Sequence, residues 1–173
     1  MKALNKTLLV AALTLSGTSL TAIAATQGNL GASSTGSSDV MIIKDNVVQL
    51  SGVGDLDLGQ HNSTDIDLTA NDDVCVFNST ATYSVTVESA GSAFELRNGA
   101  EAIPYSVLWT TSAAPATAMT HQAALGGNVG DRTSPNCNGG TNANFAVQVS
   151  SVDFNAAVPG TYTDTLTLMI EPE

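Results

Sequence analysis

The C-terminal run of residues 161–170 (TYTDTLTLMI) alternates polar and apolar side chains with a period of two. Threonine takes the first four positions on one side of this run. The other side carries Tyr162, Leu166, Leu168 and Ile170, interrupted by Asp164. Because successive side chains of a β-strand point to opposite faces, this run predicts a strand with one face in a core and one face in water.

Other segments show the same β character. Residues 82–88 (TYSVTVE) and 144–152 (NFAVQVSSV) also alternate and predict strands. Shorter β-rich segments predict further strands at residues 47–50, 55–58, 65–68, 74–77, 94–96 and 105–109. The Ala-rich stretch up to residue 125 fits either a loop or a short strand, and residues 126–142 predict a long loop. Short strands between Gly, Asn and Pro turns predict an all-β, antiparallel β-sandwich.

Residues 1–24 have the pattern of a secretory signal peptide. Two lysines precede a short apolar run, and residues 22–24 (AIA) form the small-x-small pattern that precedes cleavage. The apolar run is shorter than the roughly 20 residues that span a bilayer, and no later segment approaches that length. We therefore expect a secreted chain with no membrane insertion. A flexible polar leader at residues 25–38 would be followed by one β-sandwich domain at residues 39–173.

The chain is strongly acidic. Residues 25–173 contain three basic side chains and 16 acidic ones, which gives a formal charge of −13. A surface of this sign repels nucleic acid and anionic lipid, so we expect neither as a partner. It is also typical of a protein that stays soluble outside the cell.

Cys75 and Cys137 are the only cysteines. In a chain sent to an oxidising compartment two lone thiols usually pair, so the sequence predicts one disulfide. The competing interpretation is half of a metal site. No histidine lies near either cysteine and no C-x-x-C occurs, which favours the disulfide.

The search for catalytic motifs returns none. The two histidines, His61 and His121, stand in separate polar contexts, and no H-E-x-x-H, G-x-S-x-G or phosphate loop is present. Calcium remains an alternative, because six aspartates lie close together: Asp55, Asp57, Asp65, Asp67, Asp72 and Asp73. Their alternation with Leu and Ile favours the solvated face of a strand instead. We expect no enzyme, no metal and no cofactor.

The signal peptide and polar leader are followed by three segments that resemble pilin subunits of the chaperone–usher pathway. The resemblance is greatest to the spore coat protein U-like group of archaic pilins. The segments are DDVCVF at residues 72–77, IPYSVLW at 103–109 and PGTYTDTLTLMIEPE at 159–173. The last is the most specific, because it is similar to the G-T-Y-x-D-x-[LV]-x-[LV] ending of that group. Gly160 is the 14th residue from the C-terminal end, where a terminal strand opens in pilins.

This resemblance implies an immunoglobulin-like sandwich that lacks its final strand. A periplasmic chaperone first lends a strand, an outer-membrane usher exports the subunit, and the next subunit then inserts its N-terminal extension. The implied strand-exchange groove is lined by Tyr162, Leu166, Leu168 and Ile170. A sandwich that is complete in itself, with its terminal strand paired internally, is the alternative.

The implied donor segment departs from the family pattern. Residues 25–38 offer Leu30 as their only large apolar side chain. Val40 and Ile42, in the apolar run VMII at residues 40–43, are the other candidates.

Two functions follow as hypotheses. The first is a structural subunit of a surface fimbria, assembled by β-strand exchange with like subunits or other pilins and serving adhesion or biofilm formation. It would pass through the periplasm to the cell surface. The alternative is a free-standing secreted binding module with a complete fold.

Overall fold

The computed structural model describes residues 25–173 and divides into two units, Met1–Lys44 and Asp45–Glu173. The predicted signal peptide, residues 1–24, lies outside the described residues. In the described part of the first unit, Thr26 and Ser37 exchange two backbone hydrogen bonds of 3.0 and 3.1 Å. The domain boundary at residue 39 stays a prediction.

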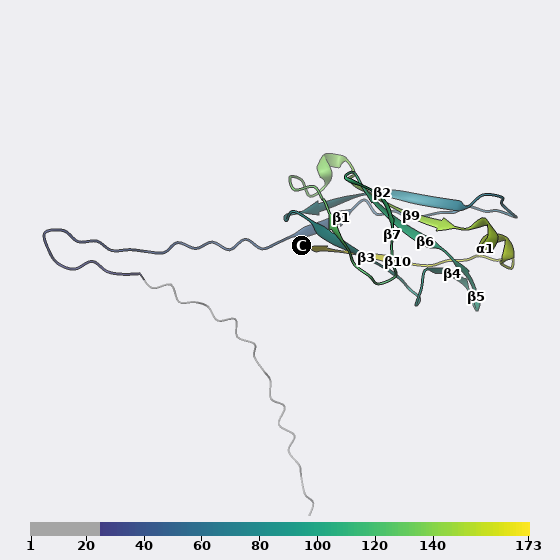
Figure 1. The fold of residues 1–173 in the computed structure, drawn as a ribbon, viewed down its shortest axis with the longest axis horizontal. Coiled ribbons are helices and arrows are strands. Elements are labelled where there is room, and N and C mark those ends of the chain that lie inside the picture. Colours follow the sequence, from purple (N-terminus) through teal and green to yellow (C-terminus); the bar gives the residue numbers. More distant parts are fainter. Residues whose placement is uncertain (1–24) are drawn as a thin grey trace, which may run out of the picture. The chain divides into compact units, whose positions relative to one another are not determined.

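The second unit contains two main antiparallel sheets and a small hairpin (Figure 1). The five-stranded sheet has the order β1 (Val48–Ser51), β2 (Leu68–Asn78), β9 (Ala143–Val149), β6 (Ser106–Thr111), β7 (Ala114–Ala118). The three-stranded sheet has the order β10 (Leu166–Pro172), β3 (Tyr83–Ser89), β8 (Leu125–Asn128). The hairpin joins β4 (Glu95–Asn98) to β5 (Glu101–Pro104). These sheets confirm the predicted all-β sandwich.

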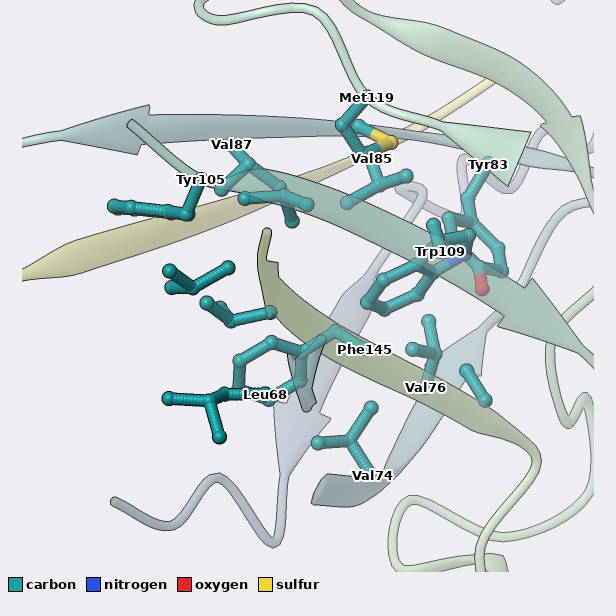
Figure 2. Close-up of a cluster of buried hydrophobic side chains, with 14 of the residues drawn as sticks. Leu68, Val74, Val76, Tyr83, Val85, Val87, Tyr105, Trp109, Met119 and Phe145 are labelled. Atoms are coloured by element: carbon teal, nitrogen blue, oxygen red, sulfur yellow. The ribbon is translucent and has the colours of Figure 1, made fainter. Parts of the chain in front are cut away.

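The core lies between the two sheets, where apolar side chains from both sheets meet (Figure 2). Val85 and Val87 enter it from β3, and Trp109 and Phe145 enter it from β6 and β9. In β9 every second residue is buried, so the predicted alternation is observed. Complete burial of a side chain of this size contributes about 1.5–3 kcal/mol relative to exposure, which makes this interface the main source of stability.

The predicted disulfide is present between Cys75 in β2 and Cys137 in the short 3-10 helix Cys137–Gly139. The two Cα atoms are 5.9 Å apart and the bond closes a sequence separation of 62 residues. It fixes the irregular segment after β8 to β2, the second strand of the five-stranded sheet.

Several predicted boundaries are wrong. Residues 55–58 form no strand, and of the predicted strand at 65–68 only Leu68 belongs to one, because β2 begins there and runs for 11 residues. The predicted strand at 144–152 ends at Val149, where Ser150 caps the helix α1 (Ser151–Ala156): its Oγ accepts a hydrogen bond of 3.0 Å from Asp153 N. Strands β5 and β8 were not predicted. No helix within residues 25–173 is long and apolar enough to cross a membrane.

Candidate functional site

Strand β10 is paired along one edge only. It lies at the border of the three-stranded sheet, with β3 as its only neighbour there. Thr165 O accepts a bond of 2.9 Å from Ala90 N, and Glu173 N donates a bond of 3.0 Å to Thr82 O, so the odd-numbered residues direct their backbone groups at β3 and its flanks. Because these groups alternate along an antiparallel strand, Leu166, Leu168 and Ile170 direct theirs at the free edge. Within residues 25–173 these groups have no strand partner.

A groove runs beside this free edge. A hollow of about 360 Å³ lies between Leu166 and Leu168 of β10 and residues 53–58, with Phe145 and Val147 of β9 also lining it. A second hollow of about 640 Å³ continues from it past Tyr162. Both hollows are lined by Leu56, Leu58, Leu96 and Asp164. We call this continuous depression the β10 groove.

Residues 53–61, which we call the strap, form the wall opposite β10. Val53 lies in the first hollow with Leu168, whereas His61 lies in the second hollow with Tyr162, so the strap and β10 run in opposite directions. Leu56 and Leu58 are half-buried and pack against the core. No backbone hydrogen bond of the described chain joins the strap to β10. The strap therefore lines the groove without completing the sheet.

Side chains hold the strap at its two ends. Gly54 N donates a hydrogen bond of 2.6 Å to Asp72 Oδ2 in β2. At the far end, the His61 ring meets the Phe154 ring edge-on at 6.0 Å, and Asn155 exchanges two hydrogen bonds with the backbone of Thr64. Both Phe154 and Asn155 belong to α1. The middle of the strap, around Leu56, is held by apolar contact alone.

Asp164 is the polar residue in the apolar row of the C-terminal run, and it lines both hollows. Its Oδ2 accepts hydrogen bonds of 2.6 Å from Ser89 Oγ and 2.5 Å from the Tyr105 hydroxyl, and its Oδ1 accepts one of 2.7 Å from Thr165 N. Burial alone would raise the pKa of this carboxyl, but these donors and the Ala90 N–H together lower the pKa below its ordinary value. Asp164 is therefore a negative charge beside the apolar side chains of Leu96 and Leu166 that also line the groove.

The Tyr105 ring supports this carboxylate. Its ring stacks on Phe94 at a centroid distance of 5.7 Å, and the His121 ring meets Phe94 edge-on at 5.2 Å. Burial raises the pKa of the Tyr105 hydroxyl, and the neighbouring Asp164 charge raises it further. The raised pKa favours the protonated hydroxyl, which donates its hydrogen bond to the Asp164 carboxylate.

The sequence-predicted groove residues lie as follows. Leu166 and Leu168 line the first hollow, and Tyr162 lines the second. The Tyr162 hydroxyl donates a hydrogen bond of 2.9 Å to Val158 O. Ile170 is half-buried against the core but lines neither hollow. The candidate donor residues Leu30, Val40 and Ile42 all belong to the first unit and are exposed.

Sequence reasoning missed the opposite wall of the groove. Leu56 and Leu58 were assigned to a strand, although their alternation with Asp55 and Asp57 does mark one apolar side. The aspartates are exposed, as a solvated face predicts. Among residues 25–173 no three His, Cys, Asp or Glu side chains are grouped as metal ligands.

No family model matches this sequence, and no curated protein sequence matches it significantly. Its fold, however, is similar to solved structures. One chain of a chaperone–tip adhesin complex, described as vital for synergistic activation of CFA/I fimbriae biogenesis, superposes with a TM-score of 0.53 at 12% identity.

That match covers 73% of this chain and 42% of the other, so this chain spans less than half the length of its structural neighbour. At this identity the likeness shows the fold: this chain has the type of β-sandwich found in a component of a fimbrial complex. The narrower resemblance to spore coat protein U-like pilins stays a prediction.

Proposed function

We propose that this chain is a non-enzymatic structural subunit of a surface fimbria, assembled by β-strand exchange. The observation that carries this proposal is the unpaired edge of β10 beside an apolar groove between the two sheets. An added strand would pair the backbone groups of Leu166 and Leu168 and fill the groove with alternate side chains. The fold shared with a fimbrial complex supports the same class of function.

The donor in this proposal is the apolar run of residues 40–43 in another copy. All four side chains are exposed, which is unusual for four consecutive large apolar residues. Val40 and Ile42 share one face of an extended segment, and Met41 and Ile43 share the other. A periplasmic chaperone and an outer-membrane usher would be the other partners, as the resemblance to pilins implies.

Alternation along the donor provides the test. Residues 25–173 are purified, and assembly is followed by size-exclusion chromatography with light scattering. Val40→Asp and Ile42→Asp place a charge in the groove and should abolish assembly, whereas Met41→Asp and Ile43→Asp place the same charge on the outer face and should largely preserve it. A chain that stays monomeric at all concentrations, or four variants that behave alike, would contradict the proposal.

A second function is favoured by one observation. Leu56 and Leu58 of the strap already fill part of the groove, as a self-complete secreted binding module would require. Such a module would be monomeric, and none of the four substitutions at residues 40–43 would change its oligomeric state or its thermal stability.

A further inference from the structure

The β10 groove carries one sign of charge. Its lining includes Asp55, Asp57 and Asp164, and neither Lys nor Arg. The ion pair of the described residues joins Arg97 to Glu95, so Asp164 has hydrogen-bond donors but no ion-pair partner, although the Arg97 backbone bonds to the adjacent Thr163. A partly buried carboxylate without a counter-ion favours an incoming positive charge.

The exposed donor run is followed by a lysine in register. Val40, Ile42 and Lys44 occupy every second position, so an extended strand presents all three on one face. On β10 and the residues before it, Asp164, Leu166 and Leu168 likewise form one row facing the groove. Each row therefore has two apolar side chains and one charged side chain. The charge is positive and last in the donor row, and negative and first in the groove row.

We propose that the β10 groove receives residues 38–44 of a second copy of this chain, antiparallel to β10, with the second copy's Lys44 placed against Asp164. This register pairs Ile42 with Leu166 and Val40 with Leu168. The inference rests on the proposed function and adds to it the direction, the register and the polar contact that sets them.

Other directions or registers of the added strand leave Leu166 and Leu168 uncovered or place the lysine against an apolar side chain. A parallel strand with Lys44 at Asp164 places Ile42 beside Tyr162 and Val40 beside Gly160, so Leu166 and Leu168 stay uncovered. An antiparallel strand shifted by two residues places the Lys44 ammonium against Leu166, where burial of an unpaired charge is costly. The small Ser38 faces Ile170 in the proposed register, and Ile170 lies outside both hollows.

Length also fits. The groove is lined from Gly160 to Leu168, which corresponds to eight steps of about 3.3 Å, or roughly 26 Å, in an extended strand. In the proposed register residues 40–44 lie opposite the stretch from Leu168 to Asp164, so they cover the half of this length that lies nearest β10. Three residues then separate Lys44 from the first strand of its own sandwich, Val48–Ser51, so successive copies would lie close together.

Cysteine cross-linking tests the register with the chain of residues 25–173. One preparation carries Ile42→Cys and a second carries a single cysteine at position 166, 168 or 170, with the native disulfide intact. Directly opposed residues lie within disulfide range, whereas a shift of two residues separates their Cα atoms by more than about 7 Å. We expect the Leu166→Cys partner to form the intermolecular disulfide at least about fivefold faster than the other two.

The outcomes of this experiment distinguish a failure of the register from a failure of strand exchange itself. Preferential cross-linking at position 168 or 170 overturns the register and leaves strand exchange intact. A chain that carries both Ile42→Cys and Leu166→Cys overturns the assignment to a second copy if its cross-link forms within one molecule. No cross-linking at any position overturns strand exchange itself.

A second experiment tests the polar contact. Lys44→Ala should slow assembly about tenfold in the native background and have little effect in an Asp164→Asn background, as coupled residues show in a double-mutant cycle. Asn keeps an oxygen that can accept from Ser89 and Tyr105, so Asp164→Asn retains a fold that circular dichroism can verify. Lys44→Arg should restore most of the rate. Equal effects of Lys44→Ala in both backgrounds overturn the Lys44–Asp164 contact.

Discussion

Asp164 shows how a single residue shapes the groove. It occupies an inward position between Tyr162 and Leu166, where an unpartnered charge would destabilise the fold. Two side-chain hydroxyls and the Thr165 N–H donate to its carboxylate, and these donors lower its pKa in the folded state. The cost of placing a charge beside the apolar wall is thus offset within the sandwich, and the charge remains available to a partner.

The lowered pKa of Asp164 predicts a pH dependence. A carboxyl whose pKa is lower in the folded state stabilises the fold above its unfolded value, near 3.8, and loses that contribution as the pH falls through the folded value. The test uses urea denaturation of the variant Ile42→Asp and of the double variant Ile42→Asp, Asp164→Asn. The free energy of unfolding should be higher for the first protein at pH 7, and the difference should shrink below about pH 3.8. A constant gap would contradict this. Asp131, whose pKa is also lowered, is present in both proteins.

Sequence reasoning located Asp164 but not its partners. The alternation of residues 161–170 marks it as the polar exception, because that pattern depends only on local geometry. Ser89 and Tyr105 are separated from it by 75 and 59 residues. No local pattern encodes such contacts, since they arise when β10 pairs with β3 and the hairpin folds beside them.

At the scale of elements, the strap is a segment whose alternating sequence predicts a strand that the structure does not form. Residues 55–58 alternate like a strand, yet they form none, because their backbone groups make no ladder of hydrogen bonds to β10 or to another strand of the described residues. Alternation specifies which side chains face inward and does not specify a backbone partner. The sequence therefore predicted the apolar side of the strap correctly and its secondary structure wrongly.

The two faces of β10 should respond differently to truncation. Leu168 is half-buried in the groove, whereas Met169 lies on the outer face with 47% of its surface exposed. Leu168→Ala should lower the free energy of unfolding by about 2 kcal/mol, and Met169→Ala should change it by less than about 0.5 kcal/mol. Urea denaturation compares them directly. Equal effects would mean that β10 does not present Leu168 to the core.

The disulfide should matter more than any single groove residue. Cys75 is buried in β2, and the bond closes a separation of 62 residues. In the chain-entropy estimate, the double variant Cys75→Ala, Cys137→Ala should have a free energy of unfolding about 4 kcal/mol lower than that of the native chain. Reduction of the native chain should give a similar loss. If neither changes the urea midpoint, the cross-link does not restrict the unfolded chain appreciably.

At the scale of the whole molecule, fold class and pairing differ in how well the sequence predicts them. Composition, turn residues and period-two runs were sufficient for an all-β sandwich with one disulfide, because these signals are local or depend on cysteine count. The order β1-β2-β9-β6-β7 required the structure, since residues far apart in sequence pair there, such as Leu68 with Val149. The groove depends on that order, and its strap wall was accordingly missed.

The net charge of −13 over residues 25–173 adds a final prediction about assembly. Copies with the same strong charge repel one another over long distances. Salt weakens this repulsion, because the Debye length falls from about 30 Å at 0.01 M to about 8 Å at 0.15 M. The proposed Lys44–Asp164 contact is short and partly buried, so salt screens it less. Raising the sodium chloride concentration over this range should therefore accelerate assembly, measured by light scattering, and the Ile42→Asp variant should remain monomeric throughout. A rate that falls with salt would show that attraction between opposite charges, and not the overall repulsion, controls the encounter of two copies.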